Sequence, residues 1–194
     1  MEINNKIRIK RFEGVYEPAE DSYLLIKAIK VRKGDRVLDM GCGTGIVAIH
    51  LAKAGCDVTA VDINERALEN TRENAERNGV KIRIVKSDLF SNIDGKFDII
   101  VFNPPYLPTR NEDIAWDGGK EGIDVIVPFL ENAKTYLNRE GSIYLVMSSL
   151  SNIDKIVRKF SKTYRFSKVA EKRLFFERLF VYRLQHIQLT DILI

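Results

Sequence analysis

An Asn-Pro-Pro-Tyr tetrapeptide at residues 103–106 has the residue types needed to hold a planar amide or amino nitrogen in place as a nucleophile. Pro104 biases Asn103 toward extended backbone, and neither Pro104 nor Pro105 has a backbone N–H. An amide or aromatic amino nitrogen is a poor nucleophile because its lone pair is delocalised. We expect the Asn103 side-chain oxygen and the Pro104 carbonyl to accept its two N–H groups, with Tyr106 stacked on the flat target. Correct orientation alone can contribute roughly 7–11 kcal/mol, so no charged base is required. The competing interpretation is a Pro-Pro surface turn.

The tetrapeptide at residues 103–106 is called the hook. A glycine loop precedes it in the chain. Gly41, Gly43 and Gly45 follow the apolar run 37–40 and come before a helix-like stretch at 46–54. Glycines allow the backbone to turn sharply and approach a ligand. Open α/β sheets bind ligands at the carboxyl ends of their strands. Because the spacing Gly-x-Gly-x-x-Ala also fits a loose dinucleotide fingerprint, an NAD-binding module without methyl-transfer activity stays open here.

Three carboxylates end or follow successive strand-like runs. Asp62 is placed to accept both hydroxyls of a ribose, and Asp88 to meet an adenine edge. Asp39 lies beside the glycine loop, where a negative charge would repel a pyrophosphate and suit an ammonium or sulfonium. The set therefore favours S-adenosylmethionine over NAD. Alternatively, Asp39 and Asp88 only cap the loops and helices that follow them.

The elements that must position these residues alternate between strand and helix. Short apolar runs of strand length lie at 36–38, 58–61, 82–85, 97–102 and 143–146. Helices are expected over 46–54 and 64–78, with Asn64 as N-cap and Gly79 just past the end. Two further apolar helix faces comprise Ile126, Phe129, Leu130, Ala133 and Leu137, and Ile153, Ile156, Val157 and Phe160. Pro128 must lie in the first turn of its helix.

This alternation predicts an α/β fold with a doubly wound, mostly parallel sheet. The runs 165–170 and 178–184 have no helix between them, so we expect an antiparallel hairpin at the sheet edge. The chain has 194 residues and no Pro/Ser-rich linker, which indicates one domain over residues 1–194.

Composition narrows the class of protein. Apolar residues make up 45% and charged residues 30%, no apolar run could cross a bilayer, and no signal peptide is evident. Two cysteines without zinc-like spacing predict a metal-free cytoplasmic protein. The net charge of +4 is concentrated in residues 165–184, which favours a solvated hairpin over a nucleic-acid-binding face.

The hook and the segment Val15-Tyr16-Glu17-Pro18-Ala19-Glu20-Asp21-Ser22 together resemble the HemK/PrmC-type glutamine methyltransferases. The likeness is to the short eukaryotic/archaeal branch, without the helical amino-terminal domain of the bacterial enzymes. It runs over nearly the whole chain and includes the Trp116-Asp117-Gly118-Gly119 loop. Asp39 stands where some members have Glu.

The resemblance implies a class I Rossmann-like fold and methylation of glutamine in the Gly-Gly-Gln loop of a translation release factor. It implies cofactor contacts for the residues Ser22, Asp39, Gly41, Asp62, Asp88 and Leu89, and it places Asn103 at the target amide, where it would border the cofactor too. A small zinc-binding activator subunit is also implied. Adenine N6 in DNA or RNA is the alternative target, and lysine the second alternative, although no base for a lysine ammonium is evident.

Overall fold

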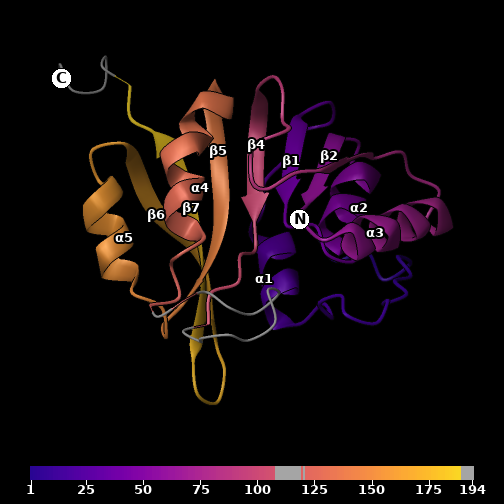
Figure 1. The fold of residues 1–194 in the computed structure, drawn as a ribbon, viewed down its shortest axis with the longest axis horizontal. Coiled ribbons are helices and arrows are strands. Elements are labelled where there is room, and N and C mark those ends of the chain that lie inside the picture. The colour runs from indigo at the N-terminus through magenta and orange to yellow at the C-terminus, as the bar shows by residue number, and fades with distance from the viewer. Residues whose placement is uncertain (108–118, 120, 189–194) are drawn as a thin grey trace.

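A computed structural model gives the fold and describes residues 1–107, 119 and 121–188 (Figure 1). The helices are α1 (Glu20–Ala28), α2 (Ile46–Lys53), α3 (Glu65–Arg77), α4 (Ile126–Ala133) and α5 (Ile153–Phe160), with a 3-10 turn at Lys134–Tyr136. The strands are β1 (Arg36–Met40), β2 (Asp57–Asp62), β3 (Arg83–Lys86), β4 (Phe97–Phe102), β5 (Leu137–Ser148), β6 (Tyr164–Arg173) and β7 (Arg178–His186). Within the described ranges, no helix is long and apolar enough to cross a membrane.

The strands form one mixed sheet in the order β3-β2-β1-β4-β5-β7-β6. The first five are parallel, and β7 pairs antiparallel with both β5 and β6. This confirms the doubly wound sheet with a carboxyl-terminal antiparallel hairpin. The order reverses at β1, and β1 and β4 lie side by side there. Ligands bind beyond the carboxyl ends of strands at such a switch point.

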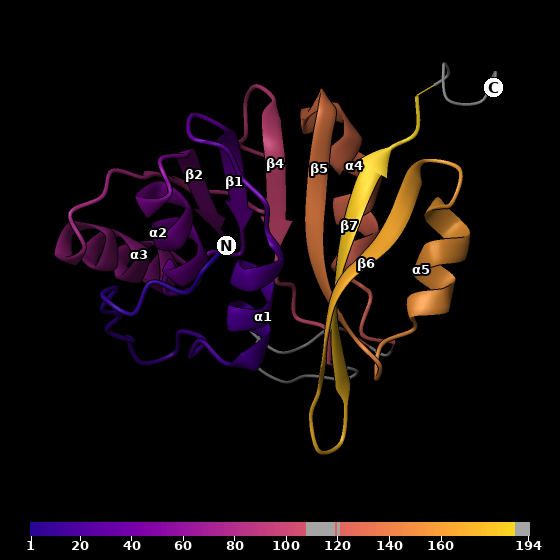
Figure 2. The ribbon, with the colours of Figure 1, turned by 180° about the vertical axis from the view of Figure 1, so that it is seen from behind.

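Successive side chains of each strand pack alternately into two separate hydrophobic cores, one on each face of the sheet. Leu38 and Ile100 pack with α4 and α5 on one face, whereas Val37 and Val101 pack with α1 and α2 on the other. Strand side chains alternate between faces with a period of two, which explains this division. In Figures 1 and 2, α2 and α3 accompany the β1–β3 half of the sheet, and α4 and α5 accompany the β5–β7 half.

The helix at 126–137 ends earlier than its apolar spacing predicts. Pro128 does lie in the first turn, but α4 stops at Ala133, and Leu137 is the first residue of β5. Leu137 pairs with Phe97 of β4 and is buried there. An apolar residue at the end of a helical pattern fits a following buried strand equally well, so periodicity could not separate the two.

The amino-terminal segment is fastened to α3 by buried asparagines. Asn70 and Asn74 are fully buried, and their side-chain oxygens accept from the N–H groups of Phe12 and Lys10, each at 2.9 Å. Their amide groups donate back to the Lys10 carbonyl at 2.7 and 2.8 Å. Because the segment is held in this way, the residues after it are brought to the sheet edge.

Candidate functional site

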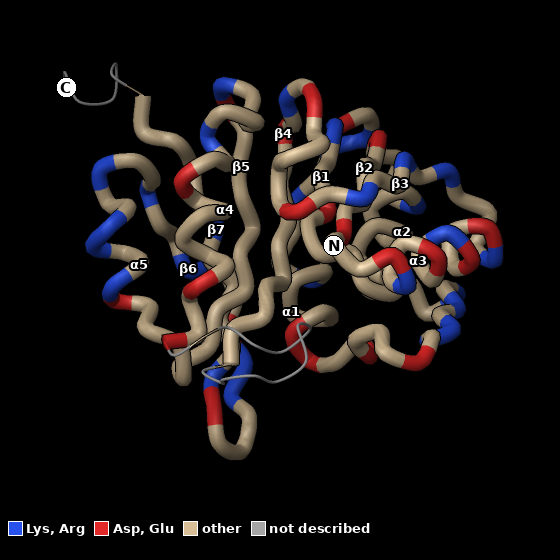
Figure 3. The backbone as a smooth tube through the Cα atoms, viewed as in Figure 1, with Lys and Arg blue, Asp and Glu red and all other residues tan. Residues whose placement is uncertain are grey.

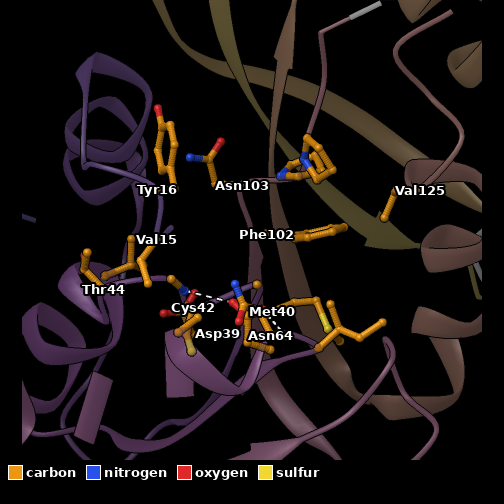
Figure 4. Close-up of a pocket in the computed structure, with 18 of the residues that line it drawn as sticks. Val15, Tyr16, Asp39, Met40, Cys42, Thr44, Asn64, Phe102, Asn103 and Val125 are labelled. Atoms are coloured by element: carbon orange, nitrogen blue, oxygen red, sulfur yellow. Dashed lines mark hydrogen bonds between the residues drawn. The ribbon is translucent and has the colours of Figure 1, made fainter. Parts of the chain in front are cut away.

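A cavity of about 880 Å³ lies at the carboxyl ends of β1, β2 and β4 (Figure 4). Its walls come from the glycine loop, the hook at 103–106 and the amino-terminal segment. The predicted site residues on its walls are Ser22, Asp39, Gly41, Gly43, Asp62, Asp88, Leu89, Asn103, Pro104, Pro105 and Tyr106. Gly45 does not line it. A volume of this size accommodates a nucleoside-containing ligand together with part of a second reactant.

The glycines of the loop have left-handed backbone, which side chains with a Cβ rarely adopt. The φ angles are +67° at Gly41, +54° at Gly43 and +80° at Gly45. A Cβ at Gly43 would meet no atom within 4 Å, so the space beside this residue is empty and forms part of the cavity that it lines. A Cβ at Gly45 would lie 2.9 Å from Cγ2 of Thr71, which shows that Gly45 permits close packing against α3.

Asp39 is buried at the start of the loop and has a structural contact of its own. Its Oδ2 accepts a hydrogen bond from the Ala48 N–H at 3.0 Å, in the first turn of α2. Only 3% of the residue is exposed, and this burial raises the pKa of the carboxyl to about 8. The nearby Asp62 acts in the same direction. Asp39 therefore caps a helix and also lines the cavity, but the raised pKa favours a neutral carboxyl near pH 7, where the sequence predicts a negative charge.

Asp62 ends β2 with both carboxylate oxygens turned toward the loops. Its Oδ2 accepts from the Gly43 N–H at 3.0 Å, and its Oδ1 accepts from the Asn64 N–H at 2.9 Å. Burial raises the pKa of this carboxyl, although three backbone N–H groups oppose that shift. Each carboxylate oxygen has a second lone pair. Asp62 can therefore still accept from a ligand hydroxyl while it fixes the glycine loop.

Asp88 and Leu89 form the far wall of the cavity after β3. Asp88 is exposed, and Leu89 has φ +46°, the only left-handed residue other than glycine among the described positions. A left-handed residue with a Cβ costs roughly 1–2 kcal/mol. Such strain is concentrated at binding sites, where the surrounding contacts hold it.

Asn103 of the hook lines the cavity, and its side-chain oxygen is an unsatisfied acceptor within the described part of the chain. Asn103 Oδ1 is buried and has no hydrogen-bond partner among the described residues, the only side-chain atom there of which this is true. Figure 4 shows the Asn103 side chain beside Tyr16, on the side of the cavity above the glycine loop. A buried acceptor without a donor costs roughly 1–3 kcal/mol. A ligand N–H at this position would remove that cost.

The end of the hook is held in place from two sides. The Tyr106 hydroxyl donates to Asp21 Oδ2 at 3.0 Å, and the Tyr106 carbonyl accepts from Ser151 Oγ at 2.8 Å. A Cβ at Gly122 would lie 2.3 Å from that same carbonyl, so only glycine fits there. The Tyr106 ring is thus fixed by its hydroxyl on the cavity wall, and its expected stacking on a target remains a prediction.

Asp21 joins the amino-terminal segment to the hook, and the sequence did not single it out as a site residue. It is 3% exposed and accepts from the Tyr16 hydroxyl at 2.7 Å and from the Ser22 N–H at 2.6 Å. Burial raises the pKa of Tyr16 and of Tyr106 above the usual range, so both stay donors. The only sequence signal was a carboxylate five residues after a tyrosine.

One feature of the family resemblance lies outside the described ranges: the loop positions Trp116, Asp117 and Gly118.

Comparison with known proteins assigns the family. The chain matches the methyltransferase small domain family over residues 7–176. A protein of Methanocaldococcus jannaschii named as a protein N5-glutamine methyltransferase is 42% identical over 161 residues, covering 79% of this chain and 82% of that one. The mouse methyltransferase HEMK2 is 34% identical over 166 residues, covering 76% of this chain and 78% of its own.

A solved structure shares the fold across its length. It is the E. cuniculi Mtq2–Trm112 complex, described as responsible for methylation of the translation termination factor eRF1. The TM-score is 0.75 at 27% identity, with 90% of this chain and 99% of the matched chain covered. The chain belongs to the methyltransferase small domain family and is a class I methyltransferase that depends on S-adenosylmethionine.

Proposed function

We propose that this chain methylates the side-chain amide nitrogen of the glutamine in the Gly-Gly-Gln loop of a translation release factor. The observation that carries this proposal is the buried Oδ1 of Asn103 after β4, which has no hydrogen-bond partner in the part of the chain that the structure describes. A primary amide has two N–H groups in one plane, which is the donor pattern that this oxygen and the Pro104 carbonyl would accept together.

The cofactor's residues in this proposal are those on the cavity wall beside the glycine loop. Asp62 would accept the ribose hydroxyls, Asp88 and Leu89 would border the adenine, and Ser22 and Asp39 would lie near the charged amino-acid end. Gly41 and Gly43 would allow its close approach. The open space at Gly43 and the strained backbone of Leu89 fit such a ligand. When bound, S-adenosylmethionine supplies an electrophilic methyl group on a sulfonium.

The hook's part in the reaction is to orient the amide. With both N–H groups held by Asn103 and Pro104, the nitrogen lone pair points out of the amide plane toward the methyl group. A C–N bond forms as the S–C bond breaks, and the surplus proton on nitrogen passes to water. Orientation of this kind contributes without any charged base. Tyr106, fixed by Asp21, would cover the flat face of the amide.

Relatives support the choice of a protein glutamine as acceptor. The Methanocaldococcus jannaschii protein is named for N5-glutamine methylation, and Mtq2 of E. cuniculi for methylation of eRF1. Because Mtq2 is seen in complex with Trm112, we also propose a small activator subunit for this chain, which we take to be one methyltransferase domain over residues 1–194.

The direct test supplies the protein with methyl-labelled cofactor and a release factor that carries Gly-Gly-Gln, with and without an activator subunit. Mass spectrometry should locate one methyl group on that glutamine, and a factor with Gln→Ala at this position should accept none. Label on adenine in DNA or RNA, or on lysine, with none on the glutamine would replace the proposal with the corresponding alternative.

A further inference from the structure

The tip of the β6–β7 hairpin carries two neighbouring phenylalanines that face solvent. Phe175 is 92% and Phe176 is 86% exposed, and their ring centroids lie 4.6 Å apart in an edge-to-face arrangement. The next most exposed large apolar residue in the described ranges is Ile63, at 50%. Aromatic side chains in this setting are typical of the centre of a protein–protein contact rather than of an ordinary surface.

The hairpin projects from the same edge of the sheet as the cavity. Tyr182 of β7 is level with Phe102 of β4, since both pair with Leu145 of β5. From Tyr182 the strand continues back to the tip, and at about 3.3 Å per residue Phe175 lies roughly 20 Å beyond the level of the hook. Figures 1 and 2 show the hairpin extending past the carboxyl ends of β1 and β4.

The turn after β5 connects the residues next to the hairpin tip to the hook. The Ser149 N–H donates to the Arg178 carbonyl at 2.8 Å, and the Arg178 N–H donates to Ser149 Oγ at 2.9 Å. Ser148 Oγ donates to Glu177 in the hairpin loop. Ser151, three residues after Ser148, donates from its Oγ to the Tyr106 carbonyl. The tip is therefore attached at a set distance and direction from Asn103.

Charges of both signs border the tip, because Glu177 directly follows Phe176 and Arg173 and Arg178 flank the turn. Arg173 has no carboxylate partner among the described residues, whereas Lys172 is paired with Glu20 and Arg178 with Glu171 at 3.6 Å. Figure 3 shows Lys and Arg on both strands above the tip, with an acidic position on one strand between them and the uncharged end of the turn. The matching surface on a partner is an apolar depression that receives the two rings.

We propose that Phe175 and Phe176 dock on the protein that carries the methylated glutamine, outside the segment that enters the cavity. This inference rests on the proposed function and names the surface by which the chain recognises its substrate. A folded protein that inserts a loop into the cavity extends far enough to cover a tip about 20 Å away. A short peptide bound at Asn103 does not, so the tip would select a folded substrate by binding energy remote from the reacting atoms.

The test compares the double variant F175A/F176A with the control V169A, which removes an apolar side chain that is 43% exposed on the same hairpin. Binding of the whole release factor is measured by calorimetry with S-adenosylhomocysteine present, and with the activator subunit added. Kinetics are measured with the whole factor and with a short Gly-Gly-Gln peptide. We expect the double variant to raise Kd and KM for the whole factor at least tenfold. Its kcat and its methylation of the short peptide should stay at the wild-type values, and V169A should match the wild type in every measurement.

Three results would overturn the inference: unchanged affinity for the factor, a parallel loss on the peptide, or a loss confined to self-association or to activator binding in sedimentation. Failure of the proposed function looks different. There the wild-type protein transfers no methyl group to the factor, while a tenfold loss of binding in the double variant still supports the docking surface. A wild-type protein that does not bind the factor contradicts both.

Discussion

At the scale of single residues, the site depends on an acceptor that the fold leaves unpaired. Most buried polar atoms in native proteins find a partner. Asn103 Oδ1 has none within the described ranges, although the Ser22, Tyr16 and Tyr106 side chains nearby are all hydrogen-bonded to Asp21. The free energy that this desolvated oxygen costs in the protein alone is regained when a donor binds. An acceptor of this kind favours binding of an amide in one orientation.

The substitution Asn103→Ala should therefore reduce methyl transfer much more than cofactor binding. We expect kcat to fall roughly 100-fold or more, because the amide loses the acceptor that orients it. The affinity for S-adenosylhomocysteine should change by only a few-fold, measured by calorimetry. Asn132→Ala, on the exposed face of α4, is the matched control and should behave as the wild type. Equal activity of both variants would contradict the assigned role of Asn103.

Asp39 predicts a particular dependence of stability on pH. Its pKa is raised to about 8 in the folded state by burial, against 3.8 in the unfolded chain. Between these two pKa values, the folded protein therefore keeps a proton on Asp39 that the unfolded chain has released. The resulting stabilisation is complete below about pH 4 and is lost as the pH rises through 8.

Asp39→Asn keeps an acceptor for the Ala48 N–H and removes the titration. Between pH 5 and pH 8 the free energy of unfolding of the wild type should fall relative to that of the variant, by about 1 kcal/mol per pH unit. Urea unfolding of both proteins at several pH values measures this difference. Parallel pH profiles would show that Asp39 does not titrate in this range.

At the scale of elements, the site is assembled by a helix face that binds an extended segment. Asn70, Asn74 and Asn78 recur at every fourth position of α3 and at its C-cap, so they lie on one face. Each accepts from a backbone N–H of residues 8–12. Asn74 also donates to the Thr44 carbonyl at 3.0 Å, which joins the same helix to the glycine loop. One helix face therefore positions two walls of the cavity.

Asn74→Ala should loosen both of these walls together. It removes hydrogen bonds to Lys10 and Thr44 at a fully buried position. At about 1 kcal/mol each, their loss should lower the free energy of unfolding by roughly 3 kcal/mol and weaken cofactor binding. Asn78→Ala, at a partly buried position near the end of the segment, should cost about 1 kcal/mol. Chemical denaturation and calorimetry give both quantities, and equal effects in the two variants would disprove the special role of Asn74.

At the scale of the whole molecule, the cavity unites segments from distant parts of the chain at one sheet edge. Binding of a ligand that contacts β1, β2 and the loop after β3 should stabilise the entire fold. At a concentration of 100 times Kd, S-adenosylhomocysteine should add about 2.7 kcal/mol. For a domain of this size, that corresponds to a rise in Tm of roughly 5–10 °C.

Thermal unfolding with and without ligand measures this rise. NADH at the same concentration should leave Tm unchanged, because the family to which the chain belongs uses S-adenosylmethionine and not a dinucleotide. Asp62→Ala should reduce the shift caused by S-adenosylhomocysteine. A larger shift with NADH would revive the dinucleotide-binding alternative.

The sequence by itself determined the parallel sheet, the hairpin at its edge and the positions of the glycine loop and the hook. These follow from local patterns: alternation of apolar runs, glycines directly after a strand, and a Pro-Pro pair that restricts Asn103. The catalytic and cofactor-binding roles assigned to individual residues stay predictions.

Only the tertiary structure decided which groups share a hydrogen bond. Asp21 contacts Tyr106, and Phe12 contacts Asn70, across long stretches of chain. The capping of α2 by Asp39 and the exposure of Phe175 likewise depend on how remote elements pack. The same holds for the Asn103 oxygen, which finds no partner among the residues described. The physical reason is that local pattern fixes backbone conformation, whereas burial and pairing are properties of the assembled fold.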